Sequence, residues 1–264
     1  MSRGPANSGG GPVRSIALYN IKGGVGKTTT AVNLAYLAAQ QGRRTLLWDL
    51  DPQAAATYLF RVRAKVKGGG ERVIRDRKPI DSAIKGTDFD GLDLLPADFT
   101  YRHMDLLLDR TKRPTRRLQR ILAPLTDDYD LVILDCPPSV SLVSENVLRA
   151  ADTVLSPVIP TTLSVRTFDQ LCEFVAGVPR RPRLVGFFSM VDRRKTLHRD
   201  LVARLPTERS DLATAAIPAQ SAIEQMAVRR APLPYYAPRS VAARCYQDLL
   251  VEALGGQPPL AVGA

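Results

Sequence analysis

The chain has 264 residues, and 45% of them are apolar, which is enough for a large buried core. Its formal net charge of +11 predicts attraction to a polyanion such as nucleic acid, an anionic membrane or an acidic partner. No apolar run approaches the roughly 20 residues that a membrane-spanning helix needs, and the N-terminal residues lack the apolar centre of a signal peptide. We therefore expect a cytoplasmic protein rather than a membrane-spanning or secreted one.

Three cysteines, Cys136, Cys172 and Cys245, lie far apart in the sequence. Their spacing is neither that of a disulfide framework nor that of a zinc site. This pattern fits a reducing compartment, where cysteines act as small apolar residues. We expect all three to be buried.

The first predicted elements form a βαβ unit. Residues 1–14 are rich in Gly, Pro and Ser, which predicts a disordered tail. The apolar run 15–19 predicts a strand, and the apolar spacing over 28–41 predicts a helix. A second buried strand is expected at 45–48, after a helix-ending glycine. Consecutive buried strands joined by a helix are typical of a parallel sheet.

Strands and helices continue to alternate along the rest of the chain. The stretch 61–78 is basic and interrupted by glycines, which predicts a surface excursion rather than a core element. The alternation predicts an α/β fold, with a mostly parallel twisted sheet covered by helices on both faces, in a single domain over 15–254 followed by a flexible tail at 255–264. Further strands are expected at 92–95, 131–134, 154–159, 184–191 and 215–217, and further helices at 101–108, 115–122, 165–178, 197–204, 221–228 and 241–254.

The segment KGGVGKTT, residues 22–29, has the form of a phosphate-binding loop between the first strand and the first helix. Its small residues let successive backbone N–H groups turn inward as an anion nest at a helix N-terminus. Lys27 supplies a charge for the β- and γ-phosphates, and the Thr28 hydroxyl is placed to ligate Mg²⁺. Lys22 is surplus to this geometry. The residues expected to bind nucleotide here are Gly23, Gly24, Val25, Gly26, Lys27, Thr28 and Thr29.

Acidic residues follow two of the predicted strands. Asp135 ends the apolar run LVILD, so its carboxylate is expected beside the loop, where it can hold Mg²⁺ or a metal-bound water. Capping of the next turn is the alternative role. Asp49 and Asp51 alternate after the second strand and would face the same side if the strand continued, so that one could orient a water toward the γ-phosphate. Spacing does not choose between this role and a turn made by Asp51 and Pro52.

Together KGGVGKTT, DLDPQ at 49–53 and LDCPPS at 134–139 resemble the ParA/MinD class of deviant-Walker P-loop ATPases, and DLDPQ resembles the ParA branch. The resemblance extends over about 15–254 and includes GLDLLPA, AADTVLSPVIP and YAPRSVAARCYQDLL. It implies the P-loop NTPase fold, ATP and Mg²⁺ as cofactors, and an ATPase activity that is slow without a partner.

The resemblance also implies roles for single residues. In that family the early lysine, here Lys22, reaches across a two-fold dimer interface to the nucleotide of the partner subunit; an exposed lysine at a strand end is the alternative. Asp51 matches the residue that positions the attacking water, and Asp135 matches the Walker B acid. Asp192 and Pro218 fall where relatives approach the adenine. The implied catalytic set is Lys22, Lys27, Asp51 and Asp135.

The basic charge is best explained by DNA. The C-terminal sequence VEALGGQPPLAVGA lacks Lys and Arg and contains Gly and Pro, unlike the basic amphipathic helix by which the MinD branch holds a membrane. ParA-like proteins instead bind duplex DNA without sequence preference. About 14 residues precede the first strand, so we expect no N-terminal helix-turn-helix domain for operator binding. Candidate contacts are Arg193, Arg194, Lys195, Arg199, Arg229, Arg230, Arg239 and Arg244, with 61–78 and 113–120 as further basic runs.

The implied function is a cycle. An ATP-bound homodimer binds nucleoid DNA, and hydrolysis stimulated by a ParB-like or analogous cargo adaptor releases it. The cargo is a chromosome or plasmid, with a protein organelle such as a carboxysome, or a chemoreceptor array, as the alternative. The competing classes are a metabolic or membrane-associated ATPase of the same loop class and a nucleotide-gated scaffold. An iron–sulfur ATPase is disfavoured because Cys136 is the one cysteine near the expected site, and a tyrosine kinase because no tyrosine follows Tyr246.

Overall fold

The computed structural model describes residues 14–66, 69–75 and 80–256. Their strands, in chain order, are β1 (Arg14–Leu18), β2 (Thr45–Asp49), β3 (Lys85–Gly86), β4 (Leu92–Leu95), β5 (Leu131–Asp135), β6 (Thr153–Val158), β7 (Arg183–Val191) and β8 (Leu212–Pro218). They form one sheet in the spatial order β3-β4-β2-β5-β1-β6-β7-β8, and β3 alone of these strands pairs antiparallel, with β4. The expected mostly parallel sheet is confirmed.

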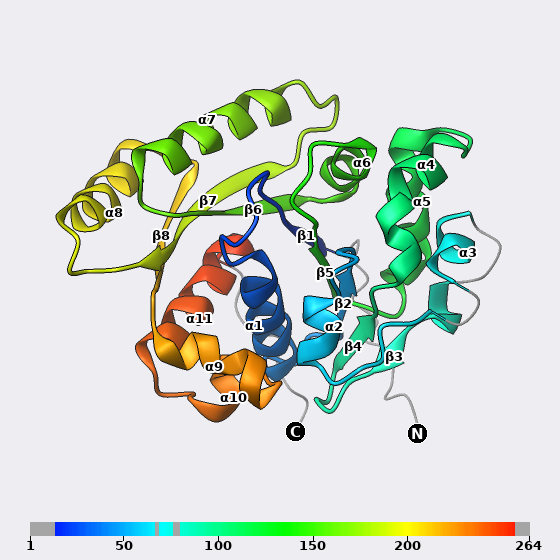
Figure 1. Ribbon diagram of the computed structural model, residues 1–264, viewed down its shortest axis with the longest axis horizontal. Coiled ribbons are helices and arrows are strands. Elements are labelled where there is room, and N and C mark those ends of the chain that lie inside the picture. Colours follow the sequence, from blue (N-terminus) through cyan, green and yellow to red (C-terminus); the bar gives the residue numbers. More distant parts are fainter. Residues whose placement is uncertain (1–13, 67–68, 76–79, 257–264) are drawn as a thin grey trace.

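Helices cover both faces of the sheet (Figure 1). The layer on one face, called the α1 layer, contains α1 (Lys27–Gln40), α2 (Ala55–Leu59), α9 (Ser221–Arg229), α10 (Leu233–Tyr236) and α11 (Val241–Ala253). The opposite layer, called the α7 layer, contains α3 (Gly70–Ile74), α4 (Met104–Asp109), α5 (Arg117–Leu122), α6 (Leu142–Ala150), α7 (Thr162–Ala176) and α8 (Thr196–Glu208). The 3-10 helices are η1 (Ile80–Ser82), η2 (Phe99–His103), η3 (Pro114–Arg116) and η4 (Ala123–Thr126).

The strands alternate between two buried cores. In β1, Ile16 and Leu18 pack against the α1 layer, whereas Ala17 packs against the α7 layer. In β2, Leu47 lies on the α1 side and Trp48 on the α7 side. Because both faces are covered, each central strand is apolar along its length, as buried parallel strands are. The same alternation decides which strand-end side chains meet α1.

The 61–78 stretch differs from its prediction as a surface excursion. Within its described part, Val66, Val73 and Ile74 are buried in the core of the α7 layer. Arg72 between them is exposed. The prediction is wrong for these three apolar residues. Val73 and Ile74 lie on the short helix α3 and pack inward, and the Val66 N–H, before that helix, donates to the Asp98 carboxylate at 2.9 Å. Residues 67–68 and 76–79 lie outside the described part.

Some boundaries and helices were also missed. Arg14 belongs to β1 and its guanidinium donates to the Leu254 carbonyl at 2.7 Å, so the first strand includes one residue that was predicted to lie in the tail. The predicted tails otherwise lie outside the described residues, apart from Gly255 and Gly256. Helix α6 was not predicted, although Ser144 Oγ accepts from the Ser141 N–H at 2.7 Å, a start signal that the sequence carries. Among the described residues, no helix is both long and apolar enough to cross a bilayer.

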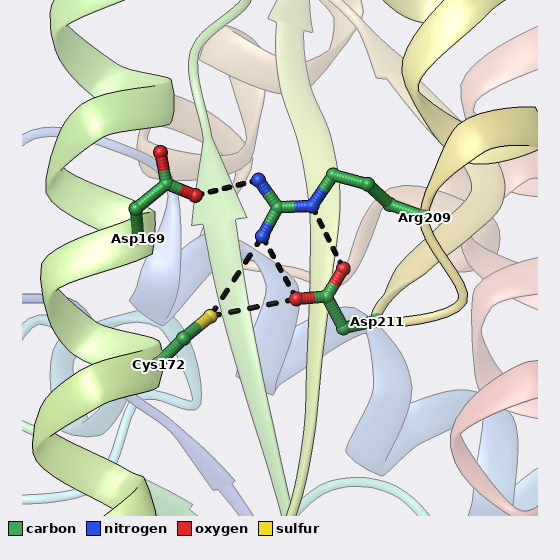
Figure 2. A network of polar contacts seen from close by, with 4 residues as sticks. All are labelled: Asp169, Cys172, Arg209 and Asp211. Carbon is green, nitrogen blue, oxygen red and sulfur yellow. Dashed lines mark hydrogen bonds and ion pairs between the residues drawn. The ribbon is translucent and has the colours of Figure 1, made fainter.

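The cysteines differ in burial. Cys136 is buried as expected, but Cys172 and Cys245 are half-buried. Cys172 lies against Arg209, whose guanidinium contacts Asp211 at 2.8 Å and Asp169 at 2.5 Å (Figure 2). Burial, followed by the Asp211 charge, raises the pKa of the Cys172 thiol to about 11. This polar network ties α7 to the segment between α8 and β8.

Candidate nucleotide-binding site

The glycine loop turns between β1 and α1 in conformations that only glycine adopts easily. Gly24 and Gly26 have φ angles of +69° and +96°. A Cβ on Gly26 would also lie 2.9 Å from Ser189 Oγ, too close for an ordinary contact. A Cβ on Gly23 would meet Pro138 at 3.8 Å, which is a normal contact distance. The loop therefore tolerates a side chain at its start but not beside α1.

Lys27 and Thr28 open α1 and lie at this turn. Lys27 is only 6% exposed, and its Nζ donates to the Lys22 carbonyl at 2.8 Å. Burial lowers the pKa of Lys27, while Asp135, Cys136 and Asp51 act in the opposite direction. An ammonium group is thus held inside the loop, next to backbone N–H groups at a helix N-terminus. This arrangement suits a phosphate.

Asp135 is the most exceptional side chain of the site. It is fully buried, and neither carboxylate oxygen has a hydrogen-bond partner among the described residues. Burial raises the pKa of Asp135 well above its ordinary value, and the Asp49 charge raises it further, while Thr28 and Lys27 lower it. A buried carboxylate without a donor is strongly destabilising, and oxygen ligands are those that Mg²⁺ prefers. Asp135 and Thr28 therefore fit a magnesium ion.

Asp49 is paired in register with Asp135 across β2 and β5, so the two carboxylates lie side by side on the α1 face. Asp49 is also fully buried, but its oxygens are occupied. They accept from the Thr57 N–H at 2.9 Å, the Thr57 hydroxyl at 2.7 Å and the Asp51 N–H at 3.2 Å. Burial raises the pKa of Asp49 to about 6. Asp49 thus holds α2 and the loop before it in place.

Asp51 differs from Asp49 in access. It is half-buried, and its Oδ1 accepts from the Gln53 N–H at 2.9 Å, which forms a turn. The alternation that would place both acids in one setting does not extend past β2, because the strand ends at Asp49. Of the two acids, Asp51 is the one whose carboxylate reaches solvent. The turn is therefore present at this residue, and its water-positioning role stays a prediction.

Lys22 lies at the edge of the site. Its side chain is close to the start of α7, with Nζ 3.5 Å from the Leu163 carbonyl. Its N–H donates to Asn20 Oδ1 at 2.8 Å, and Asn20 in turn donates to the Pro157 carbonyl at 2.8 Å. Asn20 is only 4% exposed. Sequence reasoning missed this residue, although a polar side chain directly after a buried strand was a usable signal.

The residues expected near the adenine meet at the ends of two neighbouring strands. Val191 of β7 pairs with Pro218 of β8, so Asp192 and Pro218 are adjacent at the edge where parallel strands end. Asp192 is paired with Arg194 at 2.9 Å, and hydrogen bonds from Arg194 lower its pKa to about 2. Its N–H donates to Nδ1 of the buried His198 at 3.1 Å.

Comparison with known proteins identifies the family. Residues 13–184 match the family described as AAA domain. Sporulation initiation inhibitor protein Soj of Bacillus subtilis is 33% identical over 244 residues, which cover 90% of this chain and 96% of Soj. Chromosome partitioning protein ParA of Caulobacter vibrioides is 34% identical over 194 residues, 70% of this chain and 73% of that protein. The chain belongs to the ParA/MinD-type P-loop ATPases.

Solved structures share the fold of this ParA-type ATPase. A plasmid partition protein from Borrelia burgdorferi superimposes with a TM-score of 0.77 at 23% identity, over 94% of this chain and all of that one. Cobyrinic acid a,c-diamide synthase from Mycobacterium smegmatis, with bound ADP and magnesium, gives a TM-score of 0.75 at 28% identity, over 94% and 99%. The expected P-loop NTPase fold is therefore confirmed.

The arginines proposed to contact DNA in this ParA-type ATPase differ in how many contacts they make within the protein. Arg194 is engaged by Asp192. Arg230 is half-buried, donates to the Tyr58 carbonyl at 2.9 Å, and stacks 4.4 Å above the Tyr58 ring. Arg229 stacks 4.8 Å above the Tyr236 ring. Arg230 is therefore better explained as a contact between α9 and α2 than as a DNA ligand.

Two of the remaining basic candidates, Arg193 and Arg244, lie near one half-buried thiol. Burial and the Asp248 charge raise the pKa of Cys245, and the charges of Arg193 and Arg244 lower it, so both guanidinium groups and one carboxylate lie near this sulfur. Arg244 also donates to the Arg239 carbonyl at 2.9 Å. Segments far apart in sequence are thus joined into one basic surface. We call it the Cys245 patch, and its members are Arg193, Arg239 and Arg244, all exposed.

Proposed function

We propose that this ParA-type ATPase binds ATP and Mg²⁺ and hydrolyses ATP slowly until a partner protein stimulates it. The observation that carries the proposal is the fully buried Asp135, whose oxygens have no donor among the described residues and which lies beside Lys27. A cation at Asp135 and an anion at Lys27 complement each other. A metal-bound triphosphate supplies both at once.

The residues of the site have distinct roles in this proposal. The loop Gly23–Thr29 and Lys27 bind the phosphates, and Asp192 and Pro218 lie against the adenine. Thr28 and Asp135 hold Mg²⁺, which neutralises charge on the phosphates when it is bound. Asp51, the solvent-accessible acid, orients the attacking water. Lys22 offers its ammonium to the nucleotide of a second subunit, because its side chain lies at the exposed start of α7 rather than inside its own loop.

ATP-dependent pairing of two subunits would control DNA binding. A dimer presents two Cys245 patches, and binding to DNA phosphates strengthens steeply with the number of contacts. The net charge of +11 supports a polyanionic partner. We propose a cytoplasmic, nucleoid-associated protein that binds duplex DNA without sequence preference and uses a ParB-like or analogous adaptor to move its cargo.

Two cargo classes fit this cycle, and one other class of function competes with it. Relatives named chromosome partitioning protein ParA support segregation of a chromosome or plasmid. Positioning of a protein organelle such as a carboxysome uses the same cycle with another adaptor. The structural likeness to cobyrinic acid a,c-diamide synthase supports a metabolic ATPase as the second candidate. DNA binding that depends on ATP separates the second candidate from the first.

The decisive experiment measures self-association and DNA binding with a slowly hydrolysed ATP analogue. We expect a dimer by analytical ultracentrifugation, and binding to random duplex DNA that falls steeply with salt. Lys22→Ala should remain a monomer, whereas Asp51→Ala should give a dimer that stays on DNA without turnover. A wild-type protein that remains monomeric with ATP, or ignores duplex DNA at low salt, contradicts the proposal.

The patch is tested with a matched pair of double variants. Arg239→Ala with Arg244→Ala should reduce the slope of log affinity against log salt by up to about four for a dimer. Arg180→Ala with Arg181→Ala removes equal charge from the opposite, N-terminal end of β7 and should change this slope little. Equal effects of the two pairs would mean that the Cys245 patch has no special role.

A further inference from the structure

The main chain of Lys22 is held at both of its polar groups. Its N–H donates to Asn20 Oδ1 at 2.8 Å, and its carbonyl accepts from Lys27 Nζ at 2.8 Å. The side chain, in contrast, has only a long contact of 3.5 Å to the Leu163 carbonyl at the protein surface. The position of the ammonium group is therefore set mainly by how the backbone of Lys22 is oriented.

The hold on the N–H is anchored in the sheet. Asn20 is 4% exposed, and its Nδ2 donates to the Pro157 carbonyl at 2.8 Å and to Ser156 Oγ at 3.2 Å. Both acceptors belong to β6, which neighbours β1 in the sheet. Donors and acceptor of the amide are thus all engaged, which fixes its plane. None of these atoms belongs to the phosphate loop.

The hold on the carbonyl is of a different kind. It comes from Lys27, the residue that the phosphates require. A triphosphate in the loop would compete for the Lys27 ammonium and weaken its bond to the Lys22 carbonyl. The Asn20 bond has no such competitor, because its partners are strand groups. Nucleotide therefore leaves the hydrogen bond between the Lys22 N–H and Asn20 in place, but it can break the bond between the Lys22 carbonyl and Lys27.

We propose that Asn20 is a positioning residue for Lys22, whose role in the partner subunit's site is part of the function proposed above. Asn20 keeps its hydrogen bond to the Lys22 N–H when the Lys27 ammonium leaves the Lys22 carbonyl to bind phosphate. The Lys22 peptide can then rotate about its bond to Asn20. When nucleotide binds, the Lys22 side chain therefore changes direction but does not become disordered. Without Asn20, loading of the loop would free the whole segment before Gly23.

The test is a double-mutant cycle with the full-length protein. Asn20→Ala, Lys22→Ala and the combined variant are compared for dimerisation with a slowly hydrolysed ATP analogue. Asn146→Ala is the matched control, since Asn146 is equally buried and donates to Pro114 and Leu142 carbonyls at 2.7 and 2.9 Å in a helix away from the loop. Thermal unfolding reports whether each variant folds. Hydrogen exchange of the Lys22 amide reports the hold itself.

We expect Asn20→Ala to weaken dimerisation by about tenfold or more, and to add nothing further once Lys22 is alanine. The Lys22 amide should exchange at least about tenfold faster in Asn20→Ala, while amides of β1 stay protected. Asn146→Ala should lower the unfolding temperature without changing dimerisation. Dimerisation of Asn20→Ala at the wild-type strength, or an unchanged exchange rate at Lys22, would overturn the inference.

The two proposals fail in distinguishable ways. If Lys22→Ala dimerises normally, the role of Lys22 in the partner's site is wrong, and the exchange rate alone then decides whether Asn20 holds Lys22. If Lys22→Ala stays monomeric but Asn20→Ala dimerises like wild type, the role of Lys22 stands and the positioning role of Asn20 is wrong. Ser156→Ala, which removes the longer of the β6 contacts, should give an intermediate exchange rate.

Discussion

Replacing Thr57 with valine should destabilise the protein through one buried hydroxyl group. Thr57 is fully buried, and its Oγ1 donates to Asp49 Oδ2 at 2.7 Å while accepting from the Ala97 N–H at 2.9 Å. Valine keeps the shape of the side chain but removes both bonds. The bond from the Thr57 backbone N–H to Asp49, at 2.9 Å, is retained. The variant therefore isolates the hydroxyl bridge between β2 and Ala97, which lies in the segment after β4.

The magnitude follows from the two groups left without a partner. An unpaired buried N–H at Ala97 costs about 1–3 kcal/mol, and losing a hydroxyl donor to the Asp49 carboxylate costs about 1.5–3 kcal/mol. We expect the free energy of unfolding to fall by about 3–5 kcal/mol in total. This is a large share of the roughly 5–15 kcal/mol that a domain has, so the variant should still fold but melt early.

Urea unfolding at pH 7, followed by circular dichroism, measures this change. Thr57→Ser is the matched control, because it keeps the hydroxyl and removes one buried methyl group, at a cost of about 1 kcal/mol. The slope of free energy against urea should be the same for all three proteins. If the valine variant is as stable as the serine variant, the bridge is not a stabilising element and the reasoning is refuted.

Three further predictions concern other parts of the site and the fold. Gly26→Ala should lose nucleotide binding by about tenfold or more in a fluorescence titration, because it strains the backbone and meets Ser189, whereas Gly23→Ala should bind nearly normally; equal losses would contradict the loop geometry. Because burial raises the pKa of Asp49 from 3.8 to about 6, folding stability should fall by about 2 kcal/mol as pH rises from 4 to 7. Asp49→Asn should make the fall smaller in urea titrations across pH, and the part that remains comes from the raised pKa of Asp135. With its pKa near 11, Cys172 should react with iodoacetamide at pH 8 about 100-fold more slowly than an ordinary thiol, by peptide mass spectrometry; fast labelling would show that the contacts to Arg209 open readily.

The central part of the fold could be predicted from the sequence because short segments of the chain carry the signals for it. Apolar runs such as 131–134 need burial on both faces, and helical spacing between them leaves a covered parallel sheet as the simplest solution. The phosphate loop is equally local, since glycine, lysine and threonine positions are fixed within eight residues. Placement of Asp135 beside the loop also followed, because parallel strands end at one edge.

The rest depended on contacts between distant segments. The separation of Asp49 from Asp51 depends on Thr57 and on where β2 ends, which spacing does not reveal. Asn20 is positioned by β6, more than 130 residues away along the chain. Val73 is buried by residues from other segments, and its charged neighbours in the chain gave no sign of this burial. Arg230 was selected for its charge, and its contact with Tyr58 of another helix could not be read from the sequence.

The register between Asp49 and Asp135 has a consequence for the protein when its site is empty. Two acidic groups are brought together where water is excluded, so a fully buried part of the molecule is also electrostatically frustrated. Hydrophobic packing keeps the two carboxyl groups in place, but it supplies no charge or hydrogen bond that would offset their burial and mutual repulsion. A ligand that binds only the folded form shifts the folding equilibrium toward it. Magnesium nucleotide bound at this site would then raise the stability of the folded protein by an amount that grows with its concentration.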